Sequence, residues 1–199
     1  MNKKVDVLIL AAGNASRMGE LKQLLLWQDT TLLGNAIQTA KTCNGRNIYV
    51  VLGAQAKNVI ETIAEEDCTF LINTNWKFGM GSSLSHGIKE ISIAKDPPVA
   101  ILVTVADQPY MNAAHLNTII DLYTTRNKKI VATEYKNKLG VPAIFDRSLF
   151  SALKNLSGDI GASNIIKEHL SDCIGVKAGK KLIDLDTPTD YKKHTSKKK

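Results

Sequence analysis

The segment Val5–Lys22, VDVLILAAGNASRMGELK, decides the fold class of this 199-residue chain. It opens with a continuous apolar run, Val5 to Ala12, that only Asp6 interrupts. Continuous rather than alternating apolar runs are typical of central parallel strands that are buried on both faces. A glycine-containing loop follows at once, and open α/β sheets bind ligands at such loops, where the strands end. The segment therefore predicts a central strand that leads into a binding loop.

Further apolar runs alternate with helical patterns, which is the signature of a parallel sheet covered by crossover helices. Strands are predicted at 47–52, 69–72, 99–106, 130–133, 141–145 and 173–176. Helices are predicted at 32–42, around 59–65, from the Gly79–Ser83 segment to about 93, from 112, at 148–156, at 162–169 and from 188. We expect an α/β protein with a single-domain, Rossmann-like three-layer sandwich over residues 1–191. A basic, disordered tail is expected at 192–199.

Single residues sharpen this prediction at three places. Pro142 cannot donate to a sheet ladder, so the strand at 141–145 is expected at an edge or with a bulge. Ser82 or Ser83 is the expected N-cap of its helix, because serine side chains accept backbone N–H groups there. Thr187 is the expected cap of the last helix, which Pro188 opens.

Composition excludes several classes of protein. The chain is 44% hydrophobic and 23% charged, as is ordinary for a soluble globular protein. No apolar run is long enough to span a bilayer, and Asp6 breaks the run that resembles an export signal, so we expect a cytoplasmic protein without membrane contact. The three cysteines are far apart and are expected to be reduced. Five lysines in the last eight residues supply most of the +7 net charge, so nucleic acid is not an expected partner.

The loop after the first strand has what a phosphate chain requires. Ala11, Ala12 and Gly13 are small, so backbone N–H groups can approach phosphate oxygens. Arg17 supplies a planar fork of donors, and Lys22 supplies a mobile point charge. The segment lacks both GxxxxGK[ST] and GxGxxG, which excludes a P-loop site and the dinucleotide-binding fingerprint.

Six motifs in order resemble one family, the molybdopterin-type nucleotidyltransferases, and most closely the molybdenum cofactor cytidylyltransferase branch. The first resembles that family's pattern LAAGxSxRMGxxKQLL. The motifs are Leu10–Leu25, Gly79–Leu84, Ala106–Pro109, Gly140–Ala143, Gly158–Ala162 and Asp184–Pro188. The resemblance covers nearly the whole chain. It implies a fold of the nucleotide-diphospho-sugar transferase type and an enzyme of the 2.7.7 class.

Asp107 is the predicted lead ligand of a metal ion. It ends the strand at 99–106, so its carboxylate is expected in the same crevice as Gly13. Nucleotidyl transfer needs Mg²⁺ to neutralise the triphosphate, and Mg²⁺ prefers a few carboxylates completed by phosphate oxygens and water. By resemblance Asp186 is the second ligand. Asp184 stays open as the alternative, because the two aspartates alternate along an extended segment.

The nucleotide is expected to contact the end of the first strand, Lys22, Asn73 and the first turn of the helix that begins in the Gly79–Ser83 segment. The predicted contacts are Leu10, Ala11, Ala12, Gly13, Lys22, Asn73, Gly81, Ser82 and Ser83. In the family, Ala-Ala before the glycine resembles the cytidylyl enzymes and Gly-Gly the guanylyl enzymes. The extra methyl groups narrow the site, which favours CTP.

The resemblance implies transfer of CMP from CTP to the terminal phosphate of molybdopterin or molybdenum cofactor, with release of pyrophosphate. Arg17, Lys22 and Asp107 are the expected catalytic residues, with Mg²⁺ as the cofactor. Gly140–Ala143 and Gly158–Ala162 are expected to serve the phosphorylated pterin acceptor, and a molybdoenzyme apoprotein is a candidate partner. The alternatives are use of GTP, another phosphorylated acceptor, or a non-catalytic molybdenum cofactor carrier.

Overall fold

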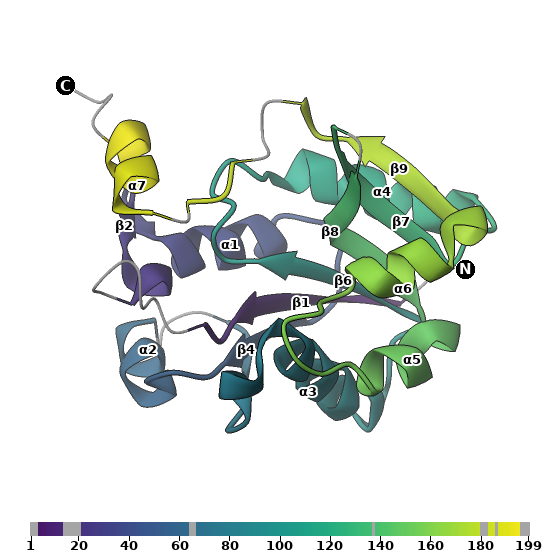
Figure 1. Cartoon of the computed structure of the whole chain (residues 1–199), viewed down its shortest axis with the longest axis horizontal. Helices are drawn as coiled ribbons and strands as arrows, with labels where there is room; N and C mark the ends of the chain where they lie inside the picture. The colour runs from purple at the N-terminus through teal and green to yellow at the C-terminus, as the bar shows by residue number, and fades with distance from the viewer. Residues whose placement is uncertain are drawn as a thin grey trace.

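The computed structural model describes residues 4–13, 21–63, 67–136, 138–179, 183–185 and 187–195. Its centre is a seven-stranded sheet with the order β5-β4-β1-β6-β8-β7-β9 (Figure 1). The strands are β1 Val5–Ala11, β4 Ile48–Leu52, β5 Thr69–Ile72, β6 Ala100–Val105, β7 Ile130–Tyr135, β8 Lys138–Asp146 and β9 Cys173–Lys177. A short hairpin, β2 Leu26–Trp27 and β3 Thr30–Thr31, forms a second sheet. Six strands of the main sheet run one way and β8 runs against them, so the predicted mostly parallel sheet is confirmed.

Helices cover both faces of this sheet, which confirms the three-layer sandwich. The helices are α1 Leu32–Lys41, α2 Ala56–Thr62, α3 Met80–Ser92, α4 Ala113–Thr125, α5 Phe150–Lys154, α6 Ser163–Glu168 and α7 Pro188–Thr195. One apolar core lies between the sheet and α1, α2 and α4, and a second lies between the sheet and α3, α5 and α6. Alternate β1 side chains enter each core, Val7 and Ile9 the first, Leu8 and Leu10 the second. Burial on both faces therefore explains the continuous apolar run.

The order of the strands reverses beside β1. The chain passes from β1 to β4 and β5 on one side, and then returns to place β6 on the other. Leu10 of β1 is level with Val105 of β6, and the Ala106 N–H donates to the Leu10 carbonyl at 3.3 Å. Connections that leave neighbouring parallel strands in opposite directions open a crevice at the strands' carboxyl ends. The residues that follow Leu10 and Ala106 thus border this crevice.

Strand β8 departs from its predicted place. It pairs with β6 on one side and β7 on the other, so of the two predicted alternatives, an edge position or a bulge, the edge position is not the one found. The predicted bulge is confirmed, because the β7–β8 register shifts between Ala132 and Thr133. Val141 and Pro142 have no paired partner at this shift, so the missing N–H of Pro142 removes no ladder bond. The Thr133 hydroxyl donates to the Pro142 carbonyl at 2.6 Å.

The two predicted helix caps have different outcomes. Gly79 precedes α3 with φ 90° and ψ −176°, a conformation that favours glycine, so the prediction of Ser82 or Ser83 as the cap is wrong. Thr187 does cap α7, because its Oγ1 accepts the Asp190 N–H at 3.1 Å and its own N–H donates to the Asp190 carboxylate at 3.1 Å. Helix α7 reaches Thr195, so the predicted boundary after residue 191 falls inside a helix. Within the described ranges, no helix has the length and apolar character needed to cross a bilayer.

A buried ion pair ties down the amino end of β1. Asp6 is fully buried, and its two carboxylate oxygens accept Arg46 Nε at 2.8 Å and Nη2 at 3.0 Å. The Asn47 N–H donates to the same carboxylate at 3.3 Å. Arg46 also reaches Asp96 at 2.5 Å, so the segments before β4 and β6 are joined at the start of β1. Two parallel donors and a backbone N–H satisfy the charge that interrupts the apolar run.

Replacing Arg46 by methionine should destabilise the fold strongly. The variant keeps an apolar stem but leaves the buried Asp6 without its cation, which costs about 3–5 kcal/mol. Urea unfolding measures the loss. Lys4→Met is the matched control, because Lys4 pairs with Asp96 at the exposed surface, where ion pairs contribute little. Equal stability losses in the two variants would contradict the assigned role of Arg46.

Candidate active site

The wall of the crevice on the β1 side is built from close backbone contacts. The Ala12 carbonyl accepts the Ala54 N–H at 3.3 Å, which joins the end of β1 to the end of β4. A Cβ added to Gly53 would lie 2.6 Å from the Ala12 oxygen and 2.5 Å from Trp76 Cβ, so no larger residue fits there. Gly13 faces the open side instead, and a Cβ on it would meet no described atom within 4 Å. Sequence reasoning missed Gly53, whose neighbours come from distant segments.

The opposite wall carries two of the three charged residues predicted for catalysis. Asp107 follows β6, and Lys22 begins the short 3₁₀ helix η1 Lys22–Leu24. Lys22 Nζ lies 2.8 Å from Asp107 Oδ2, and both side chains are partly exposed. The structure therefore brings together the predicted phosphate-binding cation and the predicted metal-binding carboxylate. Arg17 lies outside the described residues.

The segment before α7 completes this wall. The Leu185 N–H donates to the Asp107 carbonyl at 3.1 Å, which fixes the segment against the end of β6. Beside it, Asp184 Oδ1 accepts the side-chain amide of Gln108 at 2.9 Å. Asp186, the predicted second metal ligand, lies outside the described residues. Asp184, the alternative that the sequence left open, is thus hydrogen-bonded to Gln108, which directly follows Asp107.

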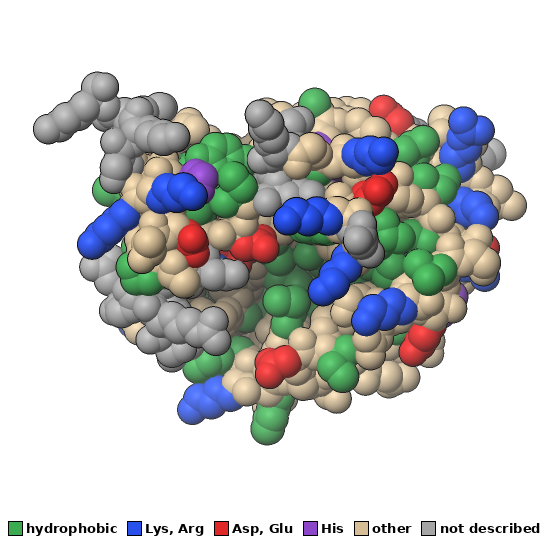
Figure 2. Space-filling model, turned by 45° about the horizontal axis from the view of Figure 1, so that its top comes forward, with side chains coloured by type: hydrophobic (Ala, Val, Ile, Leu, Met, Phe, Trp, Pro, Cys, Tyr) green, Lys and Arg blue, Asp and Glu red, His purple; other side chains and the backbone are tan. Residues whose placement is uncertain are grey.

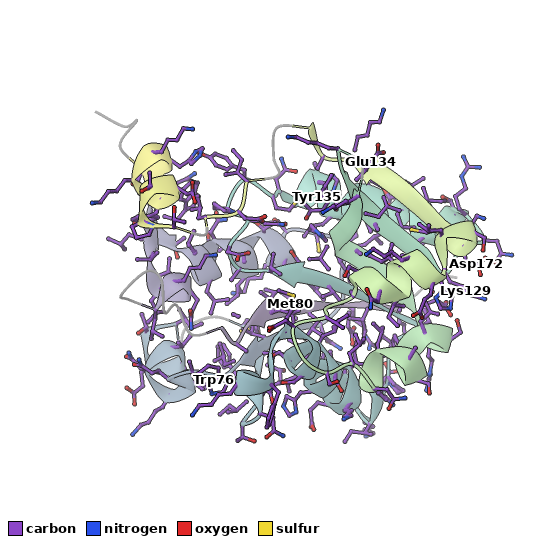
Figure 3. The ribbon with its side chains drawn as sticks, viewed as in Figure 1. Trp76, Met80, Lys129, Glu134, Tyr135 and Asp172 are labelled. Carbon is purple, nitrogen blue, oxygen red and sulfur yellow. The ribbon has the colours of Figure 1, made fainter. Side chains whose placement is uncertain are left out.

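Tyr135, the last residue of β7, connects this wall to β8. The Gln108 amide donates to the Tyr135 hydroxyl at 2.8 Å, and that hydroxyl donates to the Val141 carbonyl. Burial, together with the negative charges of Asp184 and Asp107, raises the pKa of Tyr135 to about 12. The hydroxyl therefore stays protonated at neutral pH and keeps its donor. Figure 3 shows Tyr135 at the opposite end of β7 from Lys129.

Asn73 organises the first turn of α3. Its buried amide donates to Ser82 Oγ at 2.9 Å and to Ser83 Oγ at 3.1 Å, and its oxygen accepts the Asn75 N–H at 2.9 Å. Ser82 Oγ in turn donates to the Asn75 carbonyl at 2.8 Å. Both serines lie inside the first turn of α3, which begins at Met80, so neither is at the cap position. The predicted contacts of Asn73, Ser82 and Ser83 with a nucleotide stay predictions.

Two motifs that lie far apart in the sequence form one unit at the crevice. The Gly81 N–H donates to the Gly158 carbonyl at 2.8 Å, and a Cβ on Gly81 would lie 2.6 Å from the Ile160 oxygen. A Cβ on Gly79 would similarly lie 2.4 Å from Asp159 Oδ1. Both glycines therefore let the start of α3 lie directly against the 157–161 loop. Figure 3 shows Met80, which lies between these two glycines, beside this loop.

The face that carries these groups is hollowed. Figure 2 shows a depression between the α7 side and the β7–β9 side of the molecule. Its floor is made of hydrophobic and uncharged groups, with acidic side chains on one part of the rim and Lys or Arg side chains on another. Such a surface suits a ligand that combines a planar ring with a charged phosphate chain.

The oxygen donors fit a small divalent cation. Asp107 Oδ2 already accepts the ammonium group of Lys22 at 2.8 Å, so this oxygen faces a position that a cation can reach. The described residues contain no group of three or more His, Cys, Asp or Glu side chains arranged to hold a metal. Mg²⁺ does not require such a cage, since one or two carboxylates suffice when phosphates supply further oxygens. Asp107 and the Asp184–Asp186 segment are the candidate ligands.

The model of the MobA-like NTP transferase domain matches residues 7–173, which include both walls of the crevice except the segment before α7. The chain belongs to this family. Among curated relatives of the MobA-like domain, nicotine blue oxidoreductase of Paenarthrobacter nicotinovorans is 29% identical, covering 92% of each chain. The molybdenum cofactor cytidylyltransferase of Escherichia coli strain K12 is 22% identical, covering 94% of this chain and 93% of that protein.

Solved structures agree with the family. The homologue of Mycobacterium tuberculosis Rv0371c from Mycobacterium sp. strain JC1 is 30% identical, with a TM-score of 0.83 over 96% of this chain and 94% of that one. Rv0371c itself has been solved in complex with manganese, and that structure is 25% identical with a TM-score of 0.79 over 98% and 99% of the two chains. This MobA-like chain is thus a nucleotidyltransferase with a Rossmann-like α/β fold.

Lys22→Ala should have opposite effects on two binding reactions. Without nucleotide, Mn²⁺ should bind more tightly, because the ammonium that competes for Asp107 is gone. With Mg²⁺ present, CTP should bind about 10- to 100-fold more weakly, because a charge-assisted hydrogen bond to phosphate is lost. Electron paramagnetic resonance of Mn²⁺ and calorimetry with CTP measure the two affinities.

Two further variants act as controls for this prediction. Asp107→Asn should weaken Mn²⁺ binding, and Lys57→Ala should change neither affinity, because Lys57 is exposed and pairs only loosely with Glu61 at 3.9 Å. Unchanged binding of both probes by Lys22→Ala would refute the role of the Lys22–Asp107 pair.

Proposed function

We propose that the chain transfers CMP from CTP to the terminal phosphate of molybdopterin or molybdenum cofactor, with release of pyrophosphate and with Mg²⁺ as cofactor. The observation that carries the proposal is the Lys22–Asp107 pair, 2.8 Å apart, at the crevice where β1 and β6 end. Lys22 can bind phosphate and Asp107 can bind a metal ion, and the two side chains lie side by side there. The small residues Ala11, Ala12 and Gly13 end the neighbouring strand.

The residues of the chain act by positioning and by charge. Lys22 exchanges Asp107 for the phosphate oxygens of the nucleotide, and Arg17 adds a planar fork to the same phosphates. The N–H groups beside Gly13 approach the phosphates without hindrance. A bound Mg²⁺, held by Asp107 with Asp186 or Asp184, would neutralise charge on the leaving pyrophosphate. No side-chain nucleophile is required, because the acceptor phosphate is already anionic.

The preference for CTP rests on the shape of the β1 wall. The methyl groups of Ala11 and Ala12 are buried, one in each core, so they set the wall through the backbone that they fix, and Trp76 and the Ala12 carbonyl leave no room for a side chain at Gly53. A compact wall of this kind favours a pyrimidine over a purine. The side-chain amide of Asn73 and the hydroxyls of Ser82 and Ser83, in the first turn of α3, would then contact the base and the ribose.

The choice of acceptor rests on similarity and on the opposite half of the crevice. The E. coli relative is named for cytidylyl transfer to molybdenum cofactor. We assign the acceptor to the Gly140–Ala143 part of β8 and to the Gly158–Ala162 loop, which adjoin the Asp107 wall and α3 respectively. An apoprotein that takes up the finished cofactor would be the partner of this reaction in the cytoplasm.

A screen of pyrophosphate release with the four nucleoside triphosphates, with and without molybdenum cofactor, tests this function. CTP should give release that depends on the cofactor and is at least about tenfold faster than with GTP, in line with the discrimination that a shaped pocket provides. Asp107→Asn should lower the rate about 10²- to 10³-fold, because it weakens binding of the Mg²⁺ whose charge would stabilise the transition state. Faster release with GTP would reject the CTP assignment. Tight cofactor binding without release from any nucleotide would instead support a carrier.

A further inference from the structure

Gln108 makes one contact that neither the nucleotide nor the metal requires, its hydrogen bond to Tyr135. It follows Asp107 directly, and its side chain is buried. Both hydrogens of its amide are used, one on the Tyr135 hydroxyl at 2.8 Å and one on Asp184 Oδ1 at 2.9 Å. One side chain therefore joins the end of β6, the end of β7 and the segment before α7.

The presence of an amide here is not explained by packing. Gln108 Oε1 is buried and has no hydrogen-bond partner among the described residues. A buried acceptor without a partner costs about 1–3 kcal/mol, so packing alone would favour an apolar side chain of similar size. The two donated hydrogen bonds are thus the feature that distinguishes glutamine from leucine at this position.

The bond to Tyr135 reaches the part of β8 assigned to the acceptor. The Tyr135 hydroxyl donates to the Val141 carbonyl, and a Cβ on Gly140 would lie 3.1 Å from the Tyr135 ring. Val141 lies where the β7–β8 register shifts, so ladder bonds do not hold it there. Strand pairing holds Gly140 and Ala143 at the two ends of this stretch, whereas the Val141 carbonyl between them is held by the Tyr135 hydroxyl, which in turn accepts the Gln108 amide.

We propose that Gln108 is a positioning residue for the acceptor: through Tyr135 it holds the Gly140–Ala143 stretch at a defined place relative to Asp107. This inference rests on the proposed function, in which that stretch contacts the acceptor phosphate ester. It explains why the motifs at 106–109 and 140–143, far apart in the sequence, act together. Gln108 itself contacts neither the nucleotide phosphates nor the metal in this account.

Steady-state kinetics with CTP and molybdenum cofactor test the proposal. Gln108→Leu and Tyr135→Phe should each raise the KM for the cofactor about tenfold, the effect expected on losing one well-placed hydrogen bond, and should change the KM for CTP less than about twofold. The double variant should be no worse than the worse single variant, because both changes break the same chain of contacts. Equal changes in the two KM values, or additive losses, would overturn the proposal.

Tyr123→Phe is the matched control. Tyr123 is also a buried tyrosine whose hydroxyl donates to a backbone carbonyl, that of Val99 at 3.3 Å, and to Asp146 at 2.7 Å. These partners flank the start of β6 and the end of β8, away from the crevice. Tyr123→Phe should lower stability without separating the two KM values, so a general effect of losing a buried hydroxyl can be recognised.

Hydrogen–deuterium exchange of the nucleotide-free protein gives a readout that does not depend on turnover. The amides of residues 138–141 and of Ala143 should exchange several-fold faster in Gln108→Leu and Tyr135→Phe than in the wild type or in Tyr123→Phe. Unchanged exchange in these variants would overturn the positioning role. Wild-type protein that shows no turnover of CTP would overturn the proposed function, whereas the exchange comparison would still decide whether Gln108 positions this stretch.

Discussion

The parallel pairing of β1 with β6 is the constraint on which the rest of the structure depends. These strands are neighbours in the sheet but are separated in the chain by β4, β5 and their helices. Since the connections leave their carboxyl ends in opposite directions, the crevice opens between them. The loop after β1 can then meet the aspartate after β6, and Lys22 and Asp107 come within 2.8 Å. The other walls, α3 with the 157–161 loop and β8 with Tyr135, are arranged around this junction.

The two ends of β1 carry ion pairs whose burial gives them different roles. At the amino end, Asp6 is fully buried, with two donors from Arg46, so exchange of partners would leave an uncompensated charge. At the carboxyl end, the side chains of Lys22 and Asp107 are 18% and 34% exposed, so each side chain can leave the other and bind a different group with a small loss of free energy. The first pair is suited to fixing the sheet, and the second is suited to exchange with phosphate and metal.

The sequence predicted the features that depend on local pattern. Every predicted strand is present within a few residues of its expected bounds, because burial on both faces leaves a continuous apolar signature. The sites of Lys22 and Asp107 followed from the rule that ligands bind where parallel strands end. The central place of β8 did not follow, because its partners are set by contacts between distant segments, and Pro142 is tolerated only where the register shifts.

Side-chain partners across the fold were likewise beyond sequence reasoning. Asn73 was expected at the nucleotide, yet its amide is engaged by Ser82 and Ser83. The contacts of Gly53 and Gln108 were not predicted, because the atoms they approach come from η2 Trp76–Phe78, β7 and the segment before α7. A glycine beside a predicted binding strand, and a polar residue after a predicted ligand, are the signals that could have drawn attention to them.

The hydrogen bond from Leu185 to the Asp107 carbonyl has a consequence for biosynthesis. The strands β1 and β6 and the whole phosphate-binding loop emerge from the ribosome long before residue 185 does. A nascent chain can therefore assemble most of its sheet while the Asp107 wall still lacks its last segment. Competence to bind substrate would then arise only once residue 185 has emerged, after most of the sheet has formed, so that folding of the core precedes nucleotide binding.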